Sequence, residues 1–224
     1  MQTEVLYRPG MAMARVHLGP GEAIRAEAGA MVGMSTNVTM QTGMTGGLMK
    51  GLGRMFGGES FFQNTFTAQG KPGEVLLAHS LPGDIETIEM PQAGLFVQSS
   101  SYIAAHPGIE VKTELGGFKS LLGGEGLFVL RATASGPGQS ILVGAFGGIQ
   151  PLDCNGTLII DTGHLVAWDT QLKYTRTRAA SGFVASFLSG EGFVFRFEGQ
   201  GRIWIQTRNP SEFGTAIASR LPPA

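Results

Sequence analysis

Short apolar stretches bounded by glycine or proline recur along the whole chain. Residues 61–68 alternate between apolar and polar side chains, and a Gly-Lys-Pro-Gly turn separates them from a second apolar stretch, 74–78. Similar pairs of stretches lie within 127–145 and 193–206. Apolar stretches of this length between glycines are typical of β-hairpins. The pattern therefore predicts an all-β protein built largely from hairpins.

Three similar hexamers mark an internal repeat. Gly-Gly-Glu-Ser-Phe-Phe, Gly-Gly-Glu-Gly-Leu-Phe and Ser-Gly-Glu-Gly-Phe-Val occur at equal intervals, with their glutamates at Glu59, Glu125 and Glu191. One such unit cannot bury its apolar face alone. We therefore expect a single domain, 1–224, in which three β-sandwich-like repeats pack about a pseudo-threefold axis. Their expected extents are about 3–91, 92–155 and 156–209.

The tail of the chain predicts a short C-terminal helix over about 210–221. Asn209 is a suitable N-cap, Pro210 suits the first helical position, and Glu212 follows it in the first turn. Apolar residues then recur every fourth position, at Phe213, Ile217 and Leu221. This spacing places them on one face of a helix.

The segment 42–57 departs from the repeat and predicts an amphipathic helix. Its large apolar residues share one face and are Met44, Leu48, Met49, Leu52, Met55 and Phe56. Lys50 and Arg54 fall on the opposite face. Four glycines weaken the helix by about 1 kcal/mol each, so it needs a surface to order against. Three surfaces stay open: the protein's own core, a membrane, and the groove of a protein partner.

Charge and cysteine content narrow the function classes. Sixteen basic and seventeen acidic residues give a net charge of −1, and no two basic residues are adjacent. Nucleic acid binding needs clustered basic residues, so we do not expect it. The single cysteine, Cys154, suits a reducing compartment. With no leader pattern and no apolar run long enough to span a bilayer, we expect a cytoplasmic protein, with attachment to a membrane surface left open.

The candidate catalytic and metal-binding motifs are weak. Asp161-Thr162-Gly163 matches the tripeptide of aspartic proteases, but the chemistry needs a second aspartate that the other repeats lack. A turn stabilised by the Asp161 side chain is the simpler interpretation. Glu59, Glu125 and Glu191 could form a carboxylate ring around a cation such as Ca²⁺, or could each accept backbone hydrogen bonds. We expect no catalytic residue and no cofactor.

Several motifs resemble the altered-inheritance-of-mitochondria, number twenty-four, family. They are Gly29-Ala30-Met31-Val32, Gly58-Glu59-Ser60-Phe61-Phe62, Leu81-Pro82-Gly83-Asp84-Ile85, Gly123-Gly124-Glu125-Gly126 and Asp161-Thr162-Gly163-His164-Leu165-Val166. The resemblance implies a triplicated fold like the subunit of the tryptophan RNA-binding attenuation protein. In eukaryotes it implies a link to mitochondrial inner-membrane organisation. It brings no catalytic residues to carry over.

These observations favour a non-catalytic binding or scaffold protein. We expect its partner to be a protein or a membrane surface, and a homo-oligomer is compatible with both. Two alternatives stay open. One is an enzyme or a small-molecule or metal binder that uses a cleft between repeats. The other is an RNA-binding protein, by analogy of fold.

Overall fold

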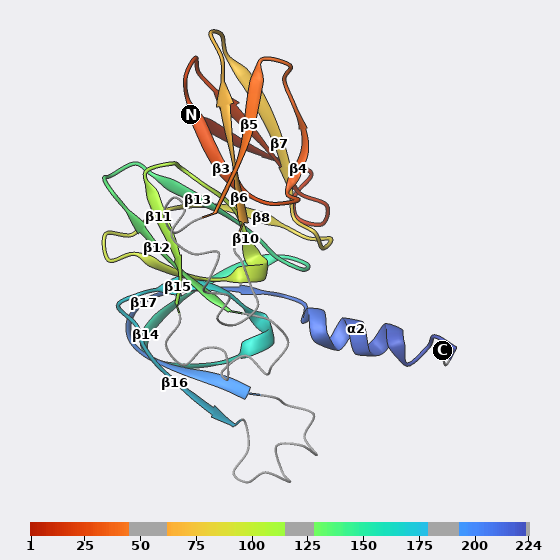
Figure 1. The fold of residues 1–224 in the computed structure, drawn as a ribbon. Helices are drawn as coiled ribbons and strands as arrows, with labels where there is room; N and C mark the ends of the chain where they lie inside the picture. The colour runs from red at the N-terminus through yellow and green to blue at the C-terminus, as the bar shows by residue number, and fades with distance from the viewer. Residues whose placement is uncertain (45–61, 115–127, 179–192, 223–224) are drawn as a thin grey trace, which may run out of the picture.

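The computed structural model describes residues 1–44, 62–114, 128–178 and 193–222 (Figure 1). The described residues form antiparallel β-sheets and a short C-terminal helix, so the predicted all-β class is confirmed. The N-terminal sheet contains, in spatial order, β1 (Gln2–Leu6), β2 (Met13–Leu18), β7 (Gly73–Ala78) and β4 (Met31–Met34).

Two further sheets continue from the first. The middle sheet contains, in spatial order, β5 (Val38–Met44), β6 (Phe62–Ala68), β3 (Ala23–Glu27), β10 (Tyr102–Ala105), β13 (Ser140–Gly144) and β8 (Ile85–Glu89). The C-terminal sheet contains β11 (Ile109–Thr113), β12 (Val129–Ala134), β9 (Leu95–Gln98), β15 (Leu165–Asp169), β17 (Phe193–Gln206) and β14 (Ile149–Asp161). A further strand, β16 (Lys173–Arg178), pairs with β17.

The predicted hairpins at the glycine-rich turns are wrong. β6 lies in the middle sheet, whereas β7, which follows the turn at 69–72, lies in the N-terminal sheet. The same separation holds for β12 and β13. The third predicted hairpin, within 193–206, is instead one continuous strand, β17. Phe66 of β6 and Val75 of β7 are fully buried in one core. The two strands therefore face each other across that core, and the turn carries the chain from one layer to the other.

Three apolar cores run along the molecule. The first lies between the N-terminal sheet and the neighbouring strands β3 and β6, and includes Val16, Ile24 and Leu77. The second is formed mainly by strands β9 to β13. The third is rich in aromatic residues and is centred on Trp168, which is 1% exposed. Burying each large side chain contributes about 1.5–3 kcal/mol. The exact division into three superposable repeats stays a prediction.

The predicted C-terminal helix is present as α2 (Pro210–Ala218). The Asn209 side chain accepts a hydrogen bond from the backbone N–H of Ser211 at 3.0 Å, as expected for an N-cap. The helix is shorter than predicted because Leu221 precedes Pro222, and a residue before proline disfavours helical backbone angles. Figure 1 shows α2 projecting from the β-sheets.

Candidate interaction surface

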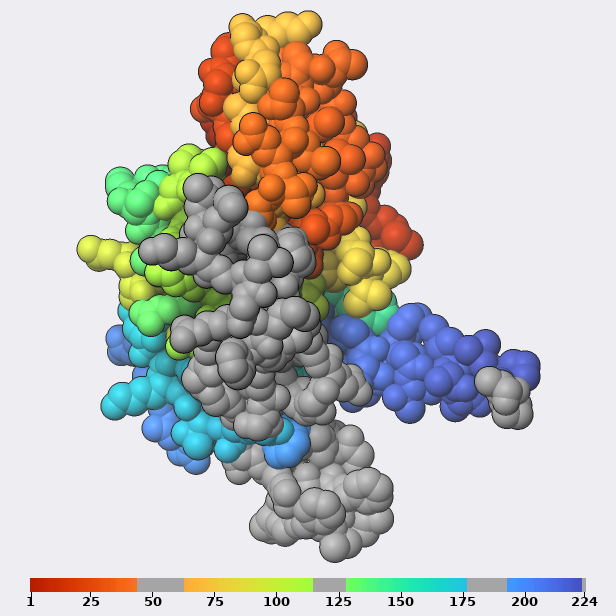
Figure 2. Space-filling model, viewed as in Figure 1, coloured from red at the N-terminus to blue at the C-terminus, as the bar shows by residue number. Residues whose placement is uncertain are grey.

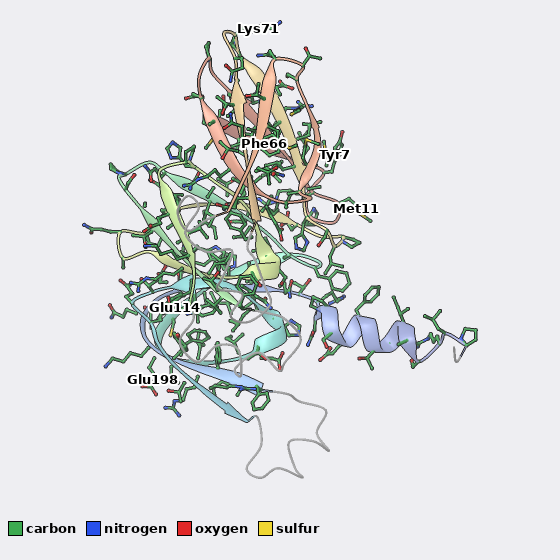
Figure 3. The ribbon with its side chains drawn as sticks, viewed as in Figure 1. Tyr7, Met11, Phe66, Lys71, Glu114 and Glu198 are labelled. Carbon is green, nitrogen blue, oxygen red and sulfur yellow. The ribbon has the colours of Figure 1, made fainter. Side chains whose placement is uncertain are left out.

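The turn between β1 and β2 presents two large apolar side chains to solvent. Tyr7 and Met11 are each 70% exposed. Tyr7 has a φ of 59°, which is unusual for a residue other than glycine, and its carbonyl accepts the N–H of Met11. Figure 3 shows both residues on the same side of the molecule as α2.

Arg8 fastens this turn to the body of the protein. Its guanidinium donates from Nε and Nη2 to the two carboxylate oxygens of Asp84, both at 2.8 Å, and from Nη2 to Glu86 at 2.9 Å. The Asp84 side chain is only 4% exposed, and the hydrogen bonds from Arg8 to these acids raise the pKa of the guanidinium. A bidentate pair with one buried partner fixes geometry as well as charge. Tyr7 and Met11 are therefore held on an anchored turn.

A short path of contacts joins the turn to α2. The N–H of Ala12 donates to the carbonyl of Gly83 at 2.8 Å, and Gly83 forms a bridge with Gly147. Phe146, next to Gly147, packs its ring against Phe213 of α2, with ring centroids 4.8 Å apart. The exposed turn and the root of the helix are thus neighbours.

The outer part of α2 carries an exposed apolar stripe. Phe213 is 46% exposed, Ile217 44% and Leu221, just beyond the helix, 63%. No residue of the helix is buried (Figure 2). The helix therefore adds little to the core, although its sequence has the periodicity of a packed helix. No helix in the described part of the chain is long and apolar enough to cross a membrane.

We call Tyr7, Met11, Phe213, Ile217 and Leu221 the apolar side. Near it, the charge of Arg8 is neutralised by Asp84 and Glu86, whereas Arg220 donates to the neutral carbonyl of Ala216 and is one basic group that keeps its charge. Contacts made by this surface should therefore be driven by burial of apolar area, with little contribution from charge.

Comparisons with known proteins place the chain in a family. A family model described as Mitochondrial biogenesis AIM24 matches residues 3–208. The chain belongs to the AIM24 family. An uncharacterized protein of Streptococcus pyogenes serotype M6, M6_Spy0233, is 32% identical over 94% of this chain and 87% of its own length. The crystal structure of protein SPYM3_0169 from Streptococcus pyogenes superposes with a TM-score of 0.79 and 26% identity, covering 98% of this chain and 99% of that one.

Most of the predicted site residues of this AIM24 chain lie outside the described residues. They are Glu59, Glu125 and Glu191 of the proposed carboxylate ring, and Leu48, Met49, Lys50, Leu52, Arg54, Met55 and Phe56 of the expected helix. Met44 is described, and it is the last residue of strand β5, paired with Phe62. Because its backbone belongs to that ladder, Met44 is not part of the expected helix.

Asp161 and Glu27 of the AIM24 chain are the last residues of β14 and β3, each at the corner that leads into the next strand. Asp161 accepts the backbone N–H of Gly163 at 2.8 Å and begins the short 3-10 helix Thr162–His164, as the turn interpretation predicts. Glu27, the last residue of β3, is partly buried, and this burial raises its pKa to about 7. Burial raises the pKa of the Tyr102 phenol, and the charge of Glu27 adds a smaller increase.

An open cleft of about 620 Å³ lies between β8 and the β14–β17 pair. Three of the four acidic residues that line it have partners. Asp153 accepts from Arg202 Nε at 2.9 Å, and Asp169 accepts the Arg202 backbone N–H at 2.8 Å. Glu86, at the other wall, is bound by Arg8. Among the described residues no group of three side chains is arranged to hold a metal ion. Cys154 is a buried free thiol of the third core.

The sequence of this AIM24 chain predicts only part of the apolar side. Residues 213, 217 and 221 follow a helical period, which located the stripe but could not show whether the core covers it. Tyr7 and Met11 lie in a turn with no period at all. The sequence feature that indicates their exposure is that both are large apolar residues next to the turn-forming Pro9 and Gly10.

Proposed function

We propose that the protein is a non-catalytic scaffold that attaches to a membrane surface through its apolar side. The observation that carries this proposal is the exposure of α2: an N-capped helix with an apolar stripe, none of whose residues is buried. A nine-residue helix is marginal in water without packing. An interface that takes up the stripe would stabilise it.

A bilayer fits this surface better than a protein groove does. The turn and the helix are two separate projecting elements, which suit a flat and yielding surface (Figure 2). Full burial of one large apolar side chain is worth about 1.5–3 kcal/mol, so partial burial of five supplies several kcal/mol before entropy losses. A basic residue adds only about 1 kcal/mol at an anionic surface. Binding should therefore tolerate salt and neutral lipid.

Vesicle flotation tests the proposal. The protein is mixed with vesicles of phosphatidylcholine, alone or with phosphatidylglycerol, and centrifuged through a density step. We expect the native chain to float with both, and the Met11→Asp, Ile217→Asp double variant to stay at the bottom. Met40→Asp is the matched control, because Met40 is 45% exposed on β5 and lies outside the apolar side. A native chain that floats with neither vesicle would refute the proposal.

The alternatives stay predictions. An enzyme or small-molecule binder would use the cleft between β8 and β17, where the aspartates Asp153 and Asp169 are already hydrogen-bonded to Arg202. An RNA-binding role rests on analogy of fold alone. Neither has a described feature that favours it as directly as the exposed helix favours attachment.

A further inference from the structure

Successive parts of the chain are joined by one kind of strand pairing. β10 pairs with β13 on one side and with β3 on the other, where Ala104 lies opposite Ala26. β15 likewise pairs with β17 on one side and with β9 on the other, where Ala167 lies opposite Val97. In both cases a strand, β10 or β15, pairs along one edge with a strand from an earlier part of the chain, β3 or β9.

β4 has the same local structure as β10 and β15. Its ladder with β7 shifts register between Met31 and Gly33. The ladders of β10 and β15 shift at the corresponding places, after Tyr102 and after Leu165. However, β4 pairs only with β7, and no strand in the described ranges lies along its other edge. The position that β3 and β9 occupy beside the other two strands is therefore open at β4.

The last part of β14, residues 157–161, has the same place in the chain order as β3 and β9. Each of the three strands is followed by a corner and then by one of the strands with the register shift. β3 leads into β4, β9 into β10, and β14 into β15. β14 ends its sheet in the described part of the chain, with β17 as its partner. Ile159 on this stretch is 60% exposed.

The edge of β4 also lacks the charges that usually prevent strands from pairing between molecules. No charged residue occurs from 28 to 49, and Met31, Val32 and Met34 are 39%, 57% and 42% exposed. Other edge strands carry charges, namely Glu4 on β1, Glu86 and Glu89 on β8, Glu110 and Lys112 on β11, Asp153 and Asp161 on β14, and Lys173 and Arg176 on β16. β5 is uncharged too, but only β4 resembles β10 and β15.

We propose that a second copy of this chain pairs the end of its β14 with β4, antiparallel and in the register used inside the chain. Inside the chain, the residue that follows the register shift lies opposite the next-to-last residue of the partner strand: Ala104 opposite Ala26, and Ala167 opposite Val97. The same rule places Gly33 opposite Ile160 of the second copy. Met34 then lies opposite Ile159 of the second copy. The corresponding internal pair is Trp168 opposite Phe96, whose rings are 5.6 Å apart. The new pair likewise joins two apolar side chains, and both of these are exposed in a single copy, Met34 at 42% and Ile159 at 60%.

The two ends of the interface differ, so the assembly is head to tail. β4 and β14 lie in opposite parts of the molecule in Figure 1. Each copy offers both edges, and such an interface either closes into a ring or extends into a chain of copies. The inference goes beyond membrane attachment, since neither Met34 nor Ile159 belongs to the apolar side, and each claim can fail without the other.

Two complementary variants test this pairing. Met34→Glu blocks one edge and Ile159→Glu blocks the other, while each leaves the opposite edge native. We expect native protein, at concentrations up to about 1 mM, to have a mass of two or more copies by light scattering, and each variant alone to have the 23.6 kDa of one chain. An equimolar mixture of the variants should give a one-to-one dimer, because one native interface can still form.

Two controls accompany the mixing experiment. Met40→Glu on β5 should keep the native mass, and Val32→Glu repeats the block of β4 with a second residue should Met34→Glu disturb folding. Native protein of one-chain mass throughout would overturn the proposal. So would variants that stay monomeric when mixed, or a Met40→Glu chain that no longer assembles.

Discussion

Gly156 and Gly199 lie directly opposite each other in the β14–β17 ladder, and both have a positive φ, of 136° and 121°. The ladder continues on both sides of them without a register shift. β17 pairs with β16 before this point and with β15 after it. Two facing glycines therefore let both strands bend together. β17 stays paired with β14, and its other edge passes from β16 to β15 without a turn.

Replacing Gly199 by alanine should lower the free energy of unfolding by about 1–3 kcal/mol, because a residue with a Cβ is strained at this φ. The added Cβ would itself have room, with Leu172 Cδ2 at 3.8 Å as its nearest neighbour. Urea denaturation measures the change. Gly43→Ala is the control, since Gly43 has no positive φ and open space where a Cβ would lie, and it should change stability by less than about 0.5 kcal/mol. Equal effects at the two positions would contradict the account.

Asp84→Asn should destabilise the protein by about 1–3 kcal/mol, because charge-assisted hydrogen bonds from Arg8 to a buried carboxylate are weakened. Glu86→Gln provides the comparison. Glu86 accepts from the same guanidinium but is more exposed, so its loss should cost about 0–1 kcal/mol. Chemical denaturation of the two variants at one pH decides the matter, and a larger effect at Glu86 would show that Asp84 is not the anchor.

Glu27 should make stability fall as pH rises. Its pKa is about 7 when folded and about 4.5 ordinarily, so between these values the folded state binds more protons than the unfolded state. The contribution is fully present below pH 4.5 and is lost as pH rises through about 7. Glu27→Gln should remove this contribution to the pH dependence of stability. The contributions of other acids with a raised pKa, Asp169 among them, should remain. The measurement is the free energy of unfolding of both proteins at several pH values from about 4.5 to about 8. The same pH dependence in the two proteins would rule this out.

A chain ending at residue 208 should keep its fold. No residue of α2 is buried, so thermal and urea unfolding should change by less than about 1 kcal/mol. The loss of the Phe146–Phe213 contact is the main structural cost. The shortened chain should nevertheless bind vesicles more weakly than the native chain. A large loss of stability would mean that the helix belongs to the core.

Much of the fold could be predicted from local sequence. The strand at 62–68 follows from its alternation, and α2 follows from Asn209, Pro210 and the four-residue spacing of apolar side chains. The pairing of strands could not be predicted in the same way. A glycine turn such as the one at 69–72 looks alike whether the next strand pairs beside the first or crosses to the other layer, because both arrangements bury alternate residues.

The candidate surface was harder to predict than the fold. The period of Phe213, Ile217 and Leu221 is the same for a helix packed on the core and for one exposed on the surface, and only tertiary structure separates them. The anchoring of Tyr7 and Met11 depends on Asp84, which is far from Arg8 in sequence. The open edge of β4 becomes visible only by comparison with the pairing of β10 and β15.

Attachment of the apolar side to a membrane is tested most directly by an environment-sensitive dye placed on that side. Met11→Cys carries the dye in one sample, and Lys71→Cys carries it in the other, because Lys71 lies at the outer tip of the N-terminal sheet in Figure 3, away from Met11 and from α2. The native Cys154 is buried and should not react. With phosphatidylcholine vesicles, we predict a blue shift and increased emission at position 11 and no change at position 71. An unchanged spectrum at position 11, or a shift at position 71 alone, would contradict the proposal.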